Sequence, residues 1–235
     1  MTCVILGAVP EDADLIREYT KNAFVICADG GLDTALKNNI RPDLIVGDFD
    51  SAETDVPEGI ETIRLPVHKD DTDMLFAVKE GFRRGCQNFF LLGALGGERF
   101  DHSIANLCVL DFISANGGKG AIISKGCQVF LLSSGKLILR EQKGSIVSVF
   151  PFGVPSCNVS YHGLEYPLTH YSLQVGIPLG VSNSIVEDHA EIILHEGKML
   201  VIVEPKAQLS AKGERKLKFS PAFFKRLRGR GGWPP

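Results

Sequence analysis

The sequence lacks several features that would place it in a membrane or outside the cell. No window approaches the roughly 18 uninterrupted apolar residues of a membrane-spanning helix. Residues 1–7 carry no basic stretch, and their apolar run is too short for a signal peptide. The six cysteines are scattered, with no Cys-x-x-Cys pair. This pattern argues against a disulfide framework or a zinc site and predicts reduced thiols in a cytoplasmic protein.

Positive charge is also scarce over most of the chain. Of the 25 Lys and Arg residues, nine lie in residues 206–230, where Glu214 is the single acidic residue. The other 16 basic and 27 acidic residues give residues 1–205 a net charge of −11. A protein that grips nucleic acid normally has a basic folded surface, so such a partner is not expected. An acidic body that binds a polyphosphate needs a metal ion or local cationic groups.

Strand-like and helical patterns alternate over the first half of the chain. Strands are expected at residues 3–9, 24–28, 44–47, 60–65, 88–95 and 120–124, and helices at residues 12–21, 32–38, 72–84 and 101–115. The alternation predicts an α/β domain with a mostly parallel sheet over residues 1–125. Ligands of such sheets bind beyond the carboxyl ends of the strands. Asp29, Asp48 and Gly93 each follow an expected strand, so we expect them at one rim.

From residue 126 the pattern changes to short alternating runs separated by Gly, Pro and Ser. Strands are expected at residues 128–132, 136–139, 145–150, 158–161, 170–175, 189–195 and 199–203. These runs predict an all-β sandwich or barrel over residues 126–205. Glu196-Gly197-Lys198 is expected to close a hairpin between the last two strands. Residues 206–235 form a basic tail that we expect to be poorly ordered or to hold a short amphipathic helix around residues 221–227.

The most informative motif is Asp48-Phe49-Asp50, directly after an expected strand. Alternation in extended chain places both carboxylates on the same side. Two like charges at this spacing repel each other, and a divalent cation is the usual remedy. The alternative is an acidic turn in which Asp50 or Ser51 makes a local hydrogen bond.

A second acidic run, Lys69-Asp70-Asp71-Thr72-Asp73, opens an expected helix. Asp70 and Asp73 are one helical turn apart, and Lys69 offers a point charge for a phosphate oxygen. Alternatively, Asp70 caps the helix while Thr72 and Asp73 favour its positive end. Together, the two acidic runs predict a site for Mg²⁺ and a nucleotide.

Two glycine loops complete the candidate rim. Asp29-Gly30-Gly31 would let backbone N–H groups approach a phosphate, although taken alone an Asp cap with a glycine turn is the better explanation. The second loop runs from Gly93 to His102. Its Arg99 has a planar fork for phosphate, and its Asp101 could cap a helix, accept a proton or bind metal. His102 is better explained as a surface or capping residue than as a catalyst.

The ordered set of motifs over residues 3–204 resembles the thiamine pyrophosphokinase family. The motifs that carry the resemblance are Asp29-Gly30-Gly31, Gly47-Asp48-Phe49-Asp50-Ser51, Asp70-x-Thr72-Asp73, Gly97-x-Arg99-x-Asp101-His102-x-x-x-Asn106 and Gly180-Val181-Ser182-Asn183. The resemblance implies an α/β domain that binds ATP and Mg²⁺, followed by a β-sandwich domain that binds thiamine. It implies a homodimer whose active site draws on both subunits. The implied reaction converts ATP and thiamine to AMP and thiamine diphosphate.

The resemblance also implies roles for individual residues. Asp48, Asp50 and Asp73 would hold or surround Mg²⁺ and the triphosphate, and with Asp101 they form the expected catalytic set. Either Asp73 or Asp101 could take the proton of the thiamine hydroxyl. The residues expected around the nucleotide are Asp29, Gly30, Gly31, Ser51, Lys69, Asp70, Thr72 and Arg99. Ser182 and Asn183 would lie near thiamine.

Three positions depart from the family pattern. A tryptophan stacks on thiamine in the animal enzymes, whereas the only tryptophan here is Trp233, in the tail. Ser184 stands where many relatives have Glu, and Lys69 stands where some have Gln. The aromatic partner of thiamine is therefore left unassigned.

Other functions share parts of this pattern. Asp48-x-Asp50 also resembles the metal-binding motif of sugar-nucleotide transferases, although the all-β second half does not favour them. A pterin pyrophosphokinase would use similar chemistry on a different acceptor. A non-catalytic sensor of nucleotide or thiamine, with a tail that binds nucleic acid, is a further alternative.

Overall fold

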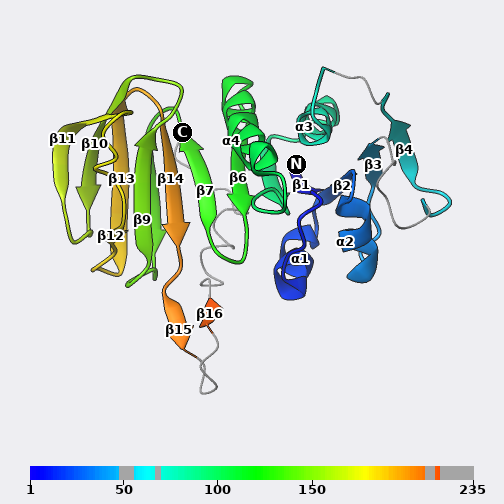
Figure 1. The fold of residues 1–235 in the computed structure, drawn as a ribbon, viewed down its shortest axis with the longest axis horizontal. Coiled ribbons are helices and arrows are strands. Elements are labelled where there is room, and N and C mark those ends of the chain that lie inside the picture. The colour runs from blue at the N-terminus through cyan, green and yellow to red at the C-terminus, as the bar shows by residue number, and fades with distance from the viewer. Residues whose placement is uncertain (48–55, 67–69, 210–214, 218–235) are drawn as a thin grey trace. The chain divides into compact units, whose positions relative to one another are not determined.

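The computed structural model describes residues 1–47, 56–66, 70–209 and 215–217. The chain divides into two compact units, Met1–Lys125 and Gly126–Pro235. Figure 1 shows the first unit in blue to green and the strands of the second from green to orange. Within the described residues, no helix is both long and apolar enough to cross a membrane.

The strands of the first unit pair in parallel, in the order β6-β5-β1-β2-β3-β4. They are β1 (Thr2–Leu6), β2 (Phe24–Ala28), β3 (Leu44–Gly47), β4 (Glu61–Arg64), β5 (Asn88–Leu92) and β6 (Lys119–Ile123). In the middle of the sheet, Ile5 pairs with Ile26 on one side and Leu91 on the other. All three side chains are fully buried, as expected for parallel strands covered on both faces.

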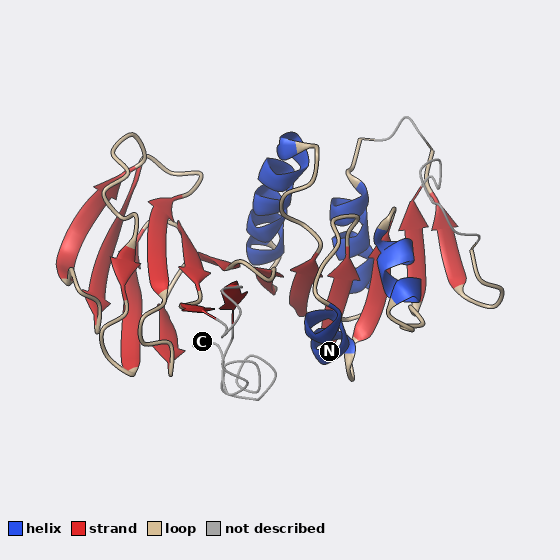
Figure 2. Ribbon diagram, turned by 60° about the horizontal axis from the view of Figure 1, so that its bottom comes forward, coloured by secondary structure: helices blue, strands red, loops and turns tan. Residues whose placement is uncertain are grey.

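Helices connect these strands (Figures 1 and 2): α1 (Ala13–Thr20), α2 (Gly31–Lys37), α3 (Asp73–Arg83) and α4 (Phe100–Ala115). Asp12 caps the N-terminus of α1, where its Oδ1 accepts a hydrogen bond from the Asp14 N–H at 3.0 Å. The buried face of α1 includes Tyr19, whose ring meets Phe90 of β5 edge-on with centroids 4.9 Å apart. The parallel α/β domain expected from the sequence is therefore confirmed.

Eight strands of the second unit pair antiparallel in two sets of four, β12-β9-β14-β7 and β11-β10-β13-β8. Their strands are β7 (Gln128–Leu132), β8 (Lys136–Arg140), β9 (Ile146–Pro151), β10 (Ser156–His162), β11 (Leu168–Gln174), β12 (Asn183–Ser184), β13 (His189–Glu196) and β14 (Met199–Glu204). On β10, Cys157, Val159 and Tyr161 are buried at every second position. The fold class predicted for this half, an all-β domain after an α/β domain, is confirmed.

One local expectation for this half is wrong. Glu196-Gly197-Lys198 does not close a hairpin, because β13 and β14 pair in different sheets. Gly197 has a φ of 90° and its backbone packs closely on Ser156, which turns the chain from one sheet to the other. In the basic tail, Ala207–Leu209 (β15) pairs antiparallel with Arg215–Leu217 (β16), and the helix expected around residues 221–227 lies outside the described residues.

Candidate functional site

The strand order of the first unit reverses at β1, and two loops meet there. The Val9 N–H, after β1, donates to the Gly93 carbonyl oxygen, after β5, at 3.2 Å. A Cβ atom on Gly93 would lie 2.5 Å from the Val9 carbonyl oxygen, and Gly93 has a φ of 64°. Glycine is therefore required for this backbone contact. Such reversal points are where open α/β sheets bind ligands.

The glycine loop that follows β5 is fastened by α4. The Ser103 hydroxyl accepts from the Gly96 N–H at 2.9 Å, and the Asn106 amide donates to the Ala94 carbonyl at 2.8 Å. Both α4 side chains are buried. Asn106, the last residue of the motif that begins at Gly97, therefore holds the loop after β5 in place.

Arg99 and Asp101 form an ion pair at the start of α4. Arg99 Nη2 lies 2.5 Å from Asp101 Oδ2, and Nε lies 3.2 Å from Oδ1. These hydrogen bonds lower the pKa of Asp101 below its ordinary value. The side chains are 67% and 64% exposed, so the pair is weak and a phosphate can compete for Arg99. Asp101 does not cap α4, since Arg99 occupies the cap position.

Asp29 follows β2 directly and has a φ of 47°. Its N–H donates to the Val46 carbonyl of β3 at 2.8 Å, which continues the strand pairing into the loop. The alternative reading of Asp29 as a helix cap is wrong, because Gly30 is the cap of α2. A Cβ atom on Gly31 would lie 1.9 Å from the Leu6 carbonyl oxygen. Gly31 is thus required by the packing of α2 on the end of β1.

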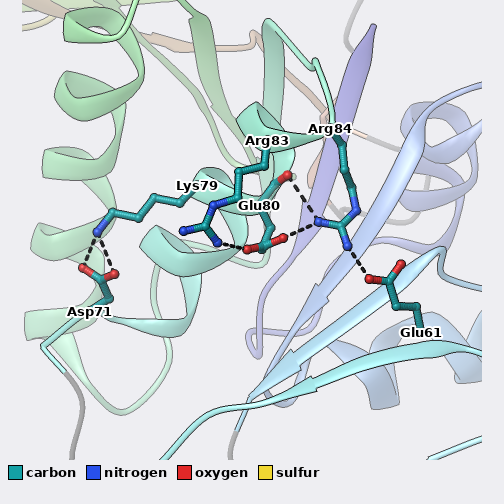
Figure 3. Close-up of polar contacts among 6 residues, drawn as sticks. All are labelled: Glu61, Asp71, Lys79, Glu80, Arg83 and Arg84. Carbon is teal, nitrogen blue, oxygen red and sulfur yellow. Dashed lines mark hydrogen bonds and ion pairs between the residues drawn. The ribbon is translucent and has the colours of Figure 1, made fainter.

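The second acidic run ends at α3. Thr72, not Asp70, caps this helix, and its hydroxyl accepts from the Leu75 N–H at 3.2 Å. The hydroxyl hydrogen of Thr72 can still be donated to another group. Asp73 is the first residue of α3, and Asp70 is exposed just before it. Asp71 pairs with Lys79 of the same helix (Figure 3).

A polar network ties the far end of α3 to β4, as Figure 3 shows. The Glu80 carboxylate is 5% exposed and accepts hydrogen bonds from Arg83 and Arg84. Arg84 also reaches Glu61 of β4, with Nη2 2.5 Å from Oε1. A buried carboxylate is tolerated when it is paired in this way. The network therefore fixes the helix on which Asp73 is placed.

The structure tests only part of the predicted set. Asp48, Asp50, Ser51 and Lys69 lie outside the described residues. Among the described residues, no three His, Cys, Asp or Glu side chains are grouped so as to hold a metal ion. Asp29, Asp73 and the Arg99–Asp101 pair each follow the carboxyl end of a strand of the same parallel sheet. A magnesium site here would need the carboxylates of Asp48 and Asp50, which follow β3 in the sequence, together with that of Asp73.

In the second unit, Asn183 holds a tyrosine that sequence analysis missed. Asn183 is 6% exposed, and its Oδ1 accepts from the Tyr166 N–H at 3.0 Å. Its Nδ2 donates to the Tyr166 carbonyl at 2.8 Å. The side chain of Tyr166 is left 65% exposed. Ser182, next to Asn183, is exposed with a φ of 59°, and its N–H donates to Ser148 Oγ at 3.1 Å.

Asn183 therefore bonds the backbone of Tyr166. That Asn183 also contacts substrate stays a prediction. The sequence offers one signal for Tyr166, an aromatic residue in an expected loop. Its pairing with a residue 17 positions away has no local signature.

Comparisons with known proteins agree with this arrangement. The family model "Thiamin pyrophosphokinase, catalytic domain" matches residues 16–117. The model "Thiamin pyrophosphokinase, vitamin B1 binding domain" matches residues 136–199. Thiamine pyrophosphokinase 3 of rice is 27% identical over 206 residues, covering 75% of this chain and 76% of its own. Thiamine pyrophosphokinase 1 of rice is 29% identical, covering 71% and 74%.

Solved structures share the fold. Thiamine pyrophosphokinase from Bacillus subtilis superposes with a TM-score of 0.77 at 21% identity, covering 87% of this chain and 99% of that one. The enzyme from Candida albicans gives a TM-score of 0.73 at 18% identity, covering 87% and 89%. The two family models match successive units in the order in which the sequence motifs occur. The chain belongs to the thiamine pyrophosphokinase family.

Proposed function

We propose that this protein transfers the pyrophosphoryl group of ATP to the hydroxyl of thiamine, giving AMP and thiamine diphosphate. The observation that carries the proposal is the match of a catalytic model to the first unit and a vitamin B1-binding model to the second. Residues 1–125 would bind ATP and Mg²⁺, residues 126–205 would bind thiamine, and residues 206–235 would be a basic tail outside the site.

In this proposal Asp48, Asp50 and Asp73 hold Mg²⁺. Mg²⁺ is bound by one or two carboxylates together with substrate phosphates, and Asp73 offers such a donor at the start of α3. When bound, the ion would neutralise phosphate charge during transfer. Asp29, Gly30 and Gly31 would lie along the nucleotide, as would Ser51, Lys69, Asp70 and Thr72.

The Arg99–Asp101 pair supports a role in phosphate binding. Arg99 presents a planar fork that is already engaged by a carboxylate, and a triphosphate can take the place of that carboxylate. A carboxyl group with a lowered pKa is a weaker base. Asp101 is thus a weaker base while Arg99 is paired with it, and Asp73 and Asp101 are both candidates for removing the thiamine proton.

Tyr166 supplies the aromatic partner that thiamine would need in place of a tryptophan. Tyr166 is exposed, its backbone N–H and carbonyl are both bonded to Asn183, and Ser182 is next to Asn183 in the chain. An aromatic face attracts a cation such as the thiazolium ring. Tyr166→Ala should raise KM for thiamine with little change in KM for ATP, and Tyr166→Phe should keep the wild-type value.

The homodimer is part of the proposal. The second unit exposes Tyr171, Val175, Ile177, Leu179, Val181 and Val186, each at least 40% accessible. Exposed apolar surface of this kind is typical of an interaction site. Light scattering should show a dimer, and Leu179→Glu should shift the mass toward one chain. A wild-type protein that is monomeric at assay concentration would remove the dimer from the proposal.

A cytoplasmic location is also proposed. It is supported by the six cysteines, all of which are free thiols in the structure. Stable proteins of oxidising compartments commonly carry disulfides. Cell fractionation with a tagged chain would test it.

A product assay tests the proposed function. The purified chain, incubated with ATP, Mg²⁺ and thiamine, should form AMP and thiamine diphosphate in equal amounts. ADP as product, or turnover of a UDP-sugar or a hydroxymethyl pterin instead, would contradict it. The nucleotide that raises Tm in the presence of Mg²⁺ distinguishes ATP from a UDP-sugar, because a ligand that binds the folded state stabilises it.

A further inference from the structure

Asp71 lies inside the acidic segment Asp70–Asp73 and forms an ion pair with Lys79 of α3. Lys79 Nζ donates to both Asp71 carboxylate oxygens, at 2.7 and 2.6 Å (Figure 3). The Lys79 side chain is 34% exposed and that of Asp71 28%. Partial burial makes this pair stronger than one in open solvent.

Lys79 is also held from the side of α4. It lies on the second turn of α3, where helical side chains point back toward the start of their helix. Its Nζ is 5.8 Å from the centroid of the Phe112 ring, within the range of a cation–π contact. The pair therefore ties the segment before α3 to both helices.

A second anchor lies directly beside the first. The Thr72 hydroxyl accepts from the Leu75 N–H, which fixes the backbone at the start of α3. Asp73 follows the two anchored residues in the chain. The chain that leads into Asp73 is thus held by the Asp71–Lys79 pair and by the Thr72 cap.

The pair also sets the local charge. Asp70, Asp71 and Asp73 put three carboxylates within four residues. Without Lys79, the charge of Asp71 would repel the other two and compete with Asp73 for a divalent cation. With Lys79 in place, both Asp71 carboxylate oxygens accept from a cation of the protein itself.

We propose that the Asp71–Lys79 ion pair positions Asp73 for the magnesium-bound nucleotide and keeps Asp71 from binding the metal. This inference rests on the proposed function. Asp71 and Lys79 are positioning residues, and neither contacts substrate.

The test measures Kd for Mg²⁺·ATP by calorimetry, and kcat and both KM values by the product assay, as Mg²⁺ is varied. Lys79→Met should weaken Mg²⁺·ATP binding about 10-fold and lower kcat by a similar factor, because small misplacements of reacting groups are costly. KM for thiamine should change less than about 2-fold, since the pair belongs to the nucleotide side. Lys79→Arg should match wild type, because Arg keeps the charge and the contact with an aromatic ring.

The double variant Asp71→Asn with Lys79→Met sharpens the test. Removing the unpaired carboxylate should restore the part of the affinity that is lost to competition by Asp71, so the double variant should bind Mg²⁺·ATP better than that single one, while its kcat stays low because the pair that positions Asp73 is absent. A pair with a purely structural role would recover Tm in the double variant, and its kcat would recover with Tm. Arg17→Met, which breaks the exposed Asp14–Arg17 pair of α1, is the matched control and should change none of these constants.

The outcomes separate the inference from the function on which it rests. A wild-type protein that neither binds Mg²⁺·ATP nor forms thiamine diphosphate would overturn both. If wild type binds and turns over, Lys79→Met constants within about 2-fold of wild type would overturn the inference alone. Failure of the double variant to recover affinity while its Tm stays at the wild-type value would also overturn it.

Discussion

The two units hold their candidate residues by different means. In the first, the loops follow parallel strands and touch through their backbones, as the Val9–Gly93 hydrogen bond shows. In the second, the contact is made by a buried side chain, because the Asn183 amide bonds both the N–H and the carbonyl of Tyr166. The proposed nucleotide side is therefore held by sheet topology, whereas the proposed thiamine side is held by the amide of Asn183. Substitutions should affect the two sides in distinct ways.

The largest effect is expected from Asp73→Asn in the first unit. We propose that the Asp73 carboxylate contacts the magnesium-bound phosphates, so its loss should lower kcat by about 100-fold or more. Tm should hardly change, because an acidic residue in a first helical turn contributes only about 0.3–1 kcal/mol. Steady-state kinetics and thermal melts give the two readings. Asp14→Asn, in the first turn of α1, is the control, and near-wild-type turnover of Asp73→Asn would refute its role.

Asn183→Leu should break the second unit's arrangement. It leaves the N–H and carbonyl of Tyr166 without their partners, which should cost about 1–3 kcal/mol of unfolding free energy. KM for thiamine should rise roughly 10-fold while KM for ATP stays unchanged, because a displaced aromatic contact is worth about 1.4 kcal/mol. Urea unfolding and kinetics in both substrates measure this. An equal rise in both KM values would contradict the separation of the two sides.

Glu80→Gln tests the anchoring of α3. Breaking a fully buried ion pair costs about 3–5 kcal/mol, but Arg83 is 65% exposed, so a loss of about 1–2 kcal/mol is expected here. Glu61→Gln, at an exposed partner of the same network, should change stability by less than about 0.5 kcal/mol. Equal losses in the two variants, measured by urea unfolding, would show that burial of Glu80 does not matter.

The smallest effect is a pH dependence in the second unit. Hydrogen bonds from Lys136 and then His189 lower the pKa of Glu191. A carboxylate with a lowered folded pKa stabilises the fold above its unfolded pKa, and this contribution is lost as pH falls through the folded value. Glu191→Gln should therefore differ from wild type most at neutral pH and converge with it below the ordinary Glu pKa of about 4.3. Parallel Tm–pH curves would contradict this.

The rim of the first unit was largely predictable from the sequence. Parallel strands place every following loop at one edge, so Asp29 and Gly93 could be assigned to that edge from their position alone. The start of α3 was predicted to within one residue, because Thr72 and the acidic residues around it are typical of a helix beginning. The pair of Asp71 with Lys79 was not predicted, since one partner precedes the helix and their spacing of eight residues exceeds the three or four at which helical side chains are direct neighbours.

The second unit was predictable as a fold but less so as a site. Alternation gave the strands, yet it does not tell which sheet each joins, and the turn at Gly197 was misassigned for that reason. Asn183 was expected beside the substrate because of its motif. Its hydrogen bonds to Tyr166 link positions far apart in the chain, and no local pattern records such a link.

The most direct test of the account is where the metal binds. A crystal of the protein with α,β-methylene-ATP and Mn²⁺ in place of Mg²⁺ would give an anomalous signal at the ion. We expect that signal at the carboxyl edge of the parallel sheet, in contact with Asp73 and with Asp48 or Asp50. A nucleotide-bound ion elsewhere on the chain, with Asp73 uninvolved, would contradict the account.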